Sequence, residues 1–135
     1  MALISNGDQV LTKRVYGSDE TLLFSTDTPT NECTLSEPLT NFEFIKIMFS
    51  INDNCQVKEF CAHISDHHKN IVCFGNADDS FAWGKQNIKF EANKVTITDA
   101  WAFVGLNANN YDANNNIYAK NSIGKIWGVN RKEDV

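Results

Sequence analysis

The stretch LSEPLTNFEFIKIMFSI, Leu35–Ile51, decides the fold. It opens with turn-forming residues and becomes almost continuously apolar from Phe42 onward. The run is too short to cross a bilayer as a helix, and its β-branched and aromatic residues favour a strand over a buried helix. The sequence therefore predicts a strand over Phe42–Ile51.

Both faces of this predicted strand are rich in apolar residues. Alternation along a strand places one set on a single face: Ile45, Ile47, Phe49 and Ile51. The opposite face carries Lys46 together with Phe42, Phe44 and Met48. A strand that is apolar on both sides is typical of the centre of a sandwich, or of a strand covered by a neighbouring subunit. Phe42, Phe44 and Met48 are therefore candidate oligomer-interface residues, with the other half of the sandwich as the alternative partner.

Short apolar runs separated by turn signals continue along the chain. They are Val10–Tyr16, Thr21–Ser25, Cys33–Ser36, Cys55–Ile64, Ile71–Phe74, Ser80–Trp83, Ile88–Phe90, Val95–Ile97, Ala100–Leu106, Ile117–Ala119 and Ile123–Val129. The expected turns include STDTPTN (25–31), SDHHKN (65–70) and EANK (91–94). About ten short strands with regular turn signals indicate an all-β fold, an antiparallel β-sandwich of jelly-roll-like type. We expect a single domain over residues 1–135, with a short flexible C-terminal tail, RKEDV.

Composition excludes several classes of partner. The net charge is −5 and no block of basic residues is present, which argues against nucleic-acid binding and against a polybasic membrane patch. The first residues, MALISNGDQV, lack the features of a secretory signal, and no apolar run is long enough to span a membrane. We expect a protein that folds in a cytoplasm without membrane insertion.

Cysteine and histidine residues form the most chemically suggestive cluster in the sequence. Its members are Cys55, Cys61, His63, His67, His68 and Cys73. Their spacing lacks the closely spaced ligand pairs of structural zinc sites, so we expect no metal and interpret the cysteines as reduced, buried thiols. No signature of a catalytic cysteine or of paired catalytic carboxylates is recognisable. The sequence therefore predicts a protein that is not an enzyme and needs no cofactor.

An asparagine-rich segment, Asn107–Asn116, is the candidate ligand-binding region, together with the loop Asn76–Trp83. Amide and carboxylate groups lie near aromatic rings in both, which suits sugar hydroxyls and a stacked sugar ring. The candidate residues are Asn109, Asn110, Tyr111, Asp112 and Trp83. A plain irregular loop and a calcium site remain alternatives, since Asn tolerates unusual backbone angles and supplies oxygen ligands. Core or interface packing is the alternative for Trp83, Trp101 and Trp127.

Two segments resemble small β-sandwich proteins of tailed-bacteriophage virions. In these proteins a segment LS-x-x-hydrophobic-x-NF-x-x-I-x-I enters the central strand, and a closing strand I-x-x-I-W/Y-G ends in a basic residue. The first segment is matched by Leu35, Ser36, Leu39, Asn41, Phe42, Ile45 and Ile47. The closing strand is matched by Ile123, Ile126, Trp127, Gly128 and Arg131, and TLLFS (21–25) fits the same layout.

The resemblance implies a surface-exposed virion protein, often a homotrimer. A tail-fibre or receptor-binding domain is the first expectation, and a capsid decoration or head-fibre protein is the alternative. The implied partners are sister subunits, other virion proteins and, for a receptor-binding domain, a host cell-surface glycan. Its expected location is the virion, after folding in the host cytoplasm. From a different class of protein, a lectin-like carbohydrate-binding module remains open.

Overall fold

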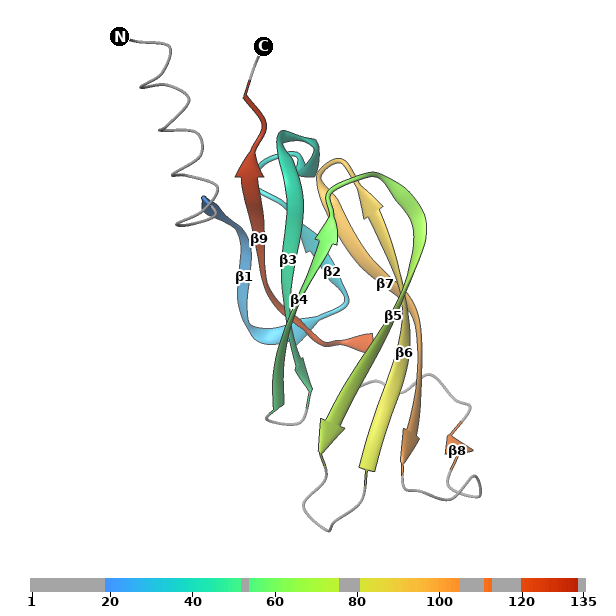
Figure 1. Ribbon diagram of the computed structural model, residues 1–135. Helices are drawn as coiled ribbons and strands as arrows, with labels where there is room; N and C mark the ends of the chain where they lie inside the picture. Colours follow the sequence, from blue (N-terminus) through green and yellow to red (C-terminus); the bar gives the residue numbers. More distant parts are fainter. Residues whose placement is uncertain (1–18, 52–53, 76–80, 105–110, 113–119, 134–135) are drawn as a thin grey trace, which may run out of the picture.

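The computed structural model describes residues 19–51, 54–75, 81–104, 111–112 and 120–133. These residues form nine β-strands and one short 3-10 turn, η1 (Leu39–Asn41). The strands make two antiparallel sheets, which confirms the predicted all-β sandwich (Figure 1). Among the described residues, no helix has the length and apolar character needed to cross a membrane.

The first sheet has the strand order β1-β9-β3-β4. Its strands are β1 (Glu20–Thr30), β9 (Ile123–Arg131), β3 (Phe42–Ile51) and β4 (Asn54–Cys61). β3 lies at the centre of this sheet, as the sequence predicts, with β9 on one side and β4 on the other. β1 begins where β9 ends, because Glu20 pairs with Val129.

The second sheet has the order β2-β7-β6-β5. Its strands are β2 (Glu32–Thr34), β7 (Lys94–Val104), β6 (Phe81–Glu91) and β5 (Ser65–Gly75), and β8 (Tyr111–Asp112) also pairs with β7. Since β6 occupies one edge of β7, β2 and β8 share its other edge, at opposite ends. β5, β6 and β7 extend past the first sheet, at the end of the molecule away from β1's start (Figure 1).

The space between the sheets is filled by the residues that alternation predicts. Ile45, Ile47, Phe49 and Ile51 are all buried. They belong to one core cluster with residues of the neighbouring strands and of the opposite sheet, including Ile123, Ile126, Ile88, Phe90, Val95 and Ile97. Burial of each large side chain contributes about 1.5–3 kcal/mol, so this cluster is the main stabilising element.

Phe42 departs from the alternation and belongs to this core. It is only 1% exposed, so the prediction that it shares an outward face with Phe44 and Met48 was wrong. The reason is a glycine on the neighbouring strand: the Phe42 ring occupies the place where a side chain at Gly128 would lie. A missing Cβ thus lets an aromatic ring cover the β9 backbone.

Several strand limits differ from the prediction. SDHHKN (65–70) is not a turn, because β5 already begins at Ser65. STDTPTN (25–31) does not close β1, which continues to Thr30 across an irregularity in its pairing with β9. Ser80–Trp83 and Ile88–Phe90 fall largely within the single strand β6, and β7 likewise covers two predicted strands. The expected strands Val10–Tyr16 and Ile117–Ala119 lie outside the described residues.

A chain of polar side chains crosses the interior between the two sheets. Lys58 Nζ donates to Asn70 Oδ1 at 3.1 Å and to the backbone oxygen of Ile71. Asn70 Nδ2 donates to Gln86 Oε1 at 2.9 Å, and Gln86 Nε2 donates to Ser122 Oγ at 2.8 Å. Buried polar groups need such partners, so this chain fixes how the sheets face each other.

Candidate interaction surfaces

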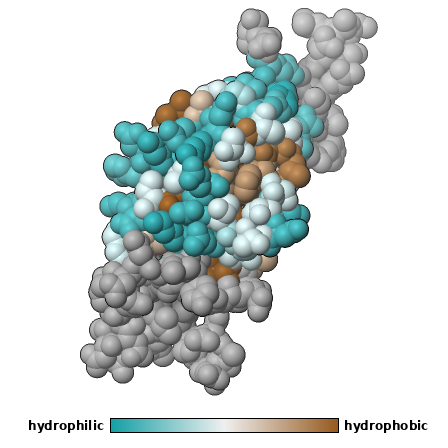
Figure 2. Space-filling model, turned by 180° about the vertical axis from the view of Figure 1, so that it is seen from behind, coloured by the Kyte–Doolittle hydropathy of each residue, from teal (hydrophilic) through white to brown (hydrophobic). Residues whose placement is uncertain are grey.

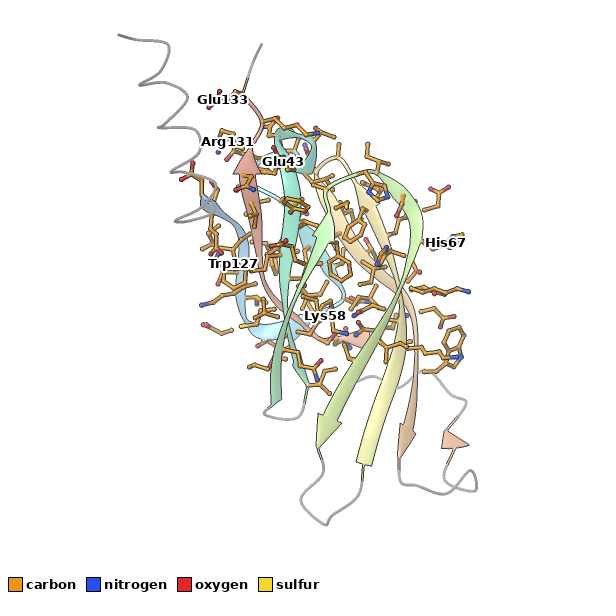
Figure 3. All side chains as sticks on the ribbon, viewed as in Figure 1. Glu43, Lys58, His67, Trp127, Arg131 and Glu133 are labelled. Carbon is orange, nitrogen blue, oxygen red and sulfur yellow. The ribbon has the colours of Figure 1, made fainter. Side chains whose placement is uncertain are left out.

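The outer face of the first sheet is the side turned away from the core. Strand pairing sets its rows: Leu22, Trp127, Lys46 and Glu59 form one, and Ser25, Lys125, Met48 and Val57 form the next. Glu20 and Phe44 flank these rows at the end where β9 finishes. Figure 3 shows Trp127 on the outside of this sheet and Lys58 between the two sheets.

Exposed apolar side chains lie on this face. Leu22 is 51% exposed and Val57 is 55% exposed, whereas Phe44, Met48 and Trp127 are half-buried. The Met48 methyl group lies over Gly124, close to where a Cβ would be. Seen from behind, most of the surface is hydrophilic, with an apolar area on the side where β1 runs (Figure 2). The predicted interface residues Phe44 and Met48 therefore border solvent, and Phe42 does not.

Charged groups interrupt this apolar surface. Lys46 Nζ pairs with Glu20 and lies 5.9 Å from the centre of the Trp127 ring. At exposed sites, a cation over an aromatic ring contributes about 0.5–1 kcal/mol to stability. An exposed ion pair contributes a similarly small amount. Lys46 therefore links side chains of β1, β3 and β9 on the outside of the sheet, with a small contribution to stability.

A second contact joins the two sequence segments singled out by the resemblance. Arg131 donates two hydrogen bonds to Glu37, Nη1 to Oε1 at 2.6 Å and Nη2 to Oε2 at 2.9 Å. The Arg131 guanidinium also lies 4.8 Å from the centre of the Phe42 ring. The hydrogen bonds from Arg131 hold the pKa of Glu37 below its usual value and raise the pKa of Arg131. Asn41 Nδ2 adds a longer contact to Glu37.

The structure separates the cysteines and histidines that the sequence groups together. Cys55 and Cys61 are exposed on β4, so the prediction of buried thiols was wrong for both. They lie six residues apart along one strand, about 20 Å at the usual rise, which is too far for two ligands of one metal ion. Cys33 is buried, and burial, with a smaller effect of Glu32, raises its pKa to about 12.

His68 packs among aromatic rings on the inner side of β5. Its ring centre lies 4.8 Å from that of Phe60 and 5.9 Å from that of Phe90. Burial, followed by the nearby His63, lowers the pKa of His68. His67, next in the chain, is exposed on the outside of the second sheet (Figure 3). Within the described part of the chain, no three metal-ligating side chains gather closely enough to hold an ion.

The candidate ligand-binding residues fall on the second sheet where they can be placed. Asn109 and Asn110 lie outside the described residues. Trp83 is in β6 and pairs with Phe103 of β7, which in turn pairs with Tyr111 of β8. Trp83, Phe103 and Tyr111 therefore occupy one row across three strands, although 28 positions separate the first from the last. Asp112 pairs with Ala102, in the next row.

No family model, no curated protein and no solved structure matches this chain. Function must therefore be argued from the surfaces themselves. Trp101 falls in the predicted run Ala100–Leu106 and was among the candidate tryptophans, whereas Phe103, which joins Trp83 to Tyr111 in the pairing, was not singled out from the sequence. The signal for Phe103 was present in AWAF (100–103), where small and aromatic residues alternate as they do along a strand.

Proposed function

We propose that this protein is a non-enzymatic structural protein on the surface of a tailed-bacteriophage virion, where it assembles as a homotrimer. The observation that carries the assembly part of the proposal is the outer face of the first sheet. It combines exposed Leu22 and Val57 with half-buried Phe44, Met48 and Trp127. Several exposed and half-buried apolar side chains on one sheet face of a small protein suit a subunit contact.

The virion assignment rests on the two segments that resemble phage sandwich proteins. Their residues have connected structural roles here. Leu39, Ile45, Ile47, Ile123 and Ile126 belong to the core cluster. Phe42 covers Gly128, Arg131 binds Glu37, and Lys132 N donates to the Asn41 oxygen at 2.8 Å. The motif thus describes one unit, β3 with β9, which supports a shared sandwich layout.

Both ends of the described chain lie at the same end of the sandwich. Asn130 N donates to the Asp19 oxygen at 3.0 Å, and the tips of β5, β6 and β7 project from the opposite end (Figure 1). A protein attached to a particle near its termini would present those tips outward. This arrangement suits a tail-fibre or receptor-binding role, and a capsid decoration or head-fibre protein is the alternative.

Light scattering on a sizing column tests the assembly. We expect a mass of three times the 15.2 kDa chain. Val57→Glu and Leu22→Glu place a charge on the outer face of the first sheet and should yield monomers that keep the wild-type circular dichroism spectrum. Ile71→Glu is the matched control, because Ile71 is 53% exposed on the other sheet. A monomeric wild-type protein would contradict the assembly proposal.

The virion assignment needs its own test. We would compare the genes around the coding sequence with portal, capsid and tail genes, and look for the protein in purified particles by mass spectrometry. A gene neighbourhood without virion genes would contradict the assignment. It would favour the second candidate, a lectin-like module, which is supported by the aromatic row of Trp83, Phe103 and Tyr111.

A further inference from the structure

Val129 of β9 is buried although it lies on the side of the first sheet that is turned away from the core. It pairs with Glu20 on one side and with Phe44 on the other. Residues two apart in a strand share a face, so Val129 shares the outer face with Trp127 (Figure 3). Val129 is nevertheless only 1% exposed, and it does not belong to the core cluster. An apolar cover over this part of the outer face would explain its burial.

The side chains nearest to Val129 on this face are charged. Lys46 pairs with Glu20, and their side chains are 26% and 38% exposed. Charged groups keep their contact with water, so this pair borders Val129 without supplying an apolar cover. Leu22 and Val57, on the edge strands of the same sheet, are exposed, which places the cover over the middle of the sheet. The structure holds a single chain, so the cover belongs to the same chain.

Residues 1–18, the N-terminal segment, leave the sandwich beside Val129. The Asp19 oxygen accepts a hydrogen bond at 3.0 Å from the backbone N–H of Asn130, the next residue after Val129. Fully extended, the 18 residues of this segment would reach about 60 Å, about twice the length of the ten-residue strand β3. The segment is therefore long enough to run along the whole outer face.

The N-terminal segment also has a composition that matches this face. Its part VLTKRVY (10–16) places apolar residues on both sides of the basic pair Lys13 and Arg14. The two rows of the outer face that contain Val129 and Trp127 hold the carboxylates of Glu20 and Glu59 and one cation, Lys46. Apolar and basic residues in the segment thus complement apolar and acidic residues on the sheet.

We propose that the N-terminal segment folds back over the outer face of the first sheet and covers Val129 on β9. Its apolar residues pack against β9 and β3, and its basic pair lies near the carboxylates of the same two rows. Leu22 and Val57 at the sheet edges remain exposed to a sister subunit. The inference therefore goes beyond the proposed assembly and does not depend on it.

Thiol labelling of the full chain is the test. Val129→Cys is combined with Cys55→Ser, Cys61→Ser and Cys73→Ser, so that buried Cys33 is the one native cysteine left. We expect the introduced thiol to react slowly with Ellman's reagent.

Substitution of the apolar residues of the N-terminal segment should remove this protection. Replacing Val10, Leu11, Val15 and Tyr16 together by serine should speed the labelling at position 129 about tenfold or more, as the loss of a local cover does. Leu22→Cys in the same two backgrounds is the control. Leu22 is already exposed, so the thiol introduced there should react quickly in both.

A second measurement uses the protein without any substitution. Trypsin cuts after Lys13 and Arg14, and the free peptide of residues 1–18 gives the rate for an uncovered segment. We expect the native protein to be cut at these two residues about tenfold more slowly than the peptide, or slower still, because a docked segment must first detach.

The inference is overturned if labelling at position 129 stays slow after the fourfold serine substitution, or if trypsin cuts the native protein as fast as the peptide. It is equally overturned if dilution of an oligomer, and not the serine substitution, speeds the labelling, because the cover is then a sister subunit. Circular dichroism verifies the fold of each variant. If Val129→Cys does not fold, the trypsin comparison decides the question.

Discussion

The ring of Phe42 lies against the backbone of Gly128, and a Cβ built on that glycine would be 2.5–2.6 Å from three ring atoms. Those atoms cannot move aside without shifting the whole ring out of the core. Gly128→Ala should therefore lower the free energy of unfolding by about 2–3 kcal/mol, as overpacking of a core does. Urea denaturation measures the change.

Gly124→Ala is the matched control for that substitution. Its Cβ would meet the Met48 methyl group at 2.9 Å, but this group is the far end of a flexible side chain. We expect a loss below about 1 kcal/mol, since methionine adapts to small changes in packing. Adding Phe42→Leu should recover part of the loss in Gly128→Ala and none in Gly124→Ala. Equal losses for the two glycine variants would show that the ring contact is unimportant.

The ion pair between Arg131 and Glu37 should make stability depend on pH in the acidic range. Its hydrogen bonds lower the pKa of Glu37 from the ordinary value of 4.5. The stabilisation is thus present above pH 4.5 and is lost as the pH falls through the lowered pKa. Glu37→Gln should lower the melting temperature at pH 7. The difference in melting temperature between the variant and the wild type should become smaller as the pH falls. A difference that is constant with pH would contradict this account.

The polar chain between the sheets should be sensitive to loss of its middle member. Gln86→Leu removes the acceptor for Asn70 Nδ2 and the donor to Ser122 Oγ. Each buried polar group that loses its partner costs about 1–3 kcal/mol, so we expect a loss of about 2–4 kcal/mol in chemical denaturation. Asn87→Leu, one residue along β6 on the outer face, should change stability by less than about 0.5 kcal/mol.

The cysteines should differ sharply in reactivity. In a Cys73→Ser background, Ellman's reagent should react quickly with Cys55 and Cys61 and not with Cys33, which is buried and has a pKa of about 12. Above pH 9 the unfolded chain ionises Cys33 while the folded chain keeps it protonated, so stability should fall between pH 9 and pH 12. Cys33→Ala should flatten that decline. Fast labelling of three thiols in the native state would contradict the burial.

His68 should weaken the fold at mildly acidic pH. Burial and His63 lower the pKa of His68 from its ordinary 6.5, so the unfolded chain takes up a proton first as the pH drops. Stability is then lost below pH 6.5, and His68→Phe, which suits the contacts with Phe60 and Phe90, should remove this loss. Exposed His67→Gln is the control, and the loss of stability caused by His68 should persist in it because His68 is still present.

The sequence was a good guide wherever apolar residues alternate in a buried strand. β3 runs from Phe42 to Ile51, as alternation predicts, and the turn between β6 and β7 falls within the predicted segment 91–94. Only the second half of β5 was predicted from the sequence, as the run Ile71–Phe74, because β5 is an edge strand. Its first residues are polar since one side meets solvent and Asn70 joins the interior polar chain.

Contacts between distant segments account for the rest of the differences. Phe42 turns inward because residue 128 is a glycine, and Cys55 and Cys61 are exposed because they alternate in step with Val57 and Glu59 on the outer face of β4. The aromatic row depends on the pairing of β6, β7 and β8, which composition does not specify. The sequence marks Trp83 and Tyr111 as separate candidates, and only the pairing register shows that they lie in one row.

The start of β1 beside the end of β9 has a mechanical consequence. Glu20 pairs with Val129, Thr21 with Gly128 and Leu22 with Trp127, so the pairing begins at the end from which both strands leave the sandwich. A force that pulls these two ends apart would load the Glu20–Val129 pair first and open the others in succession, like a zipper. If the protein were attached only through the start of β1 or only through the end of β9, no tension would act across the pairing of these two strands.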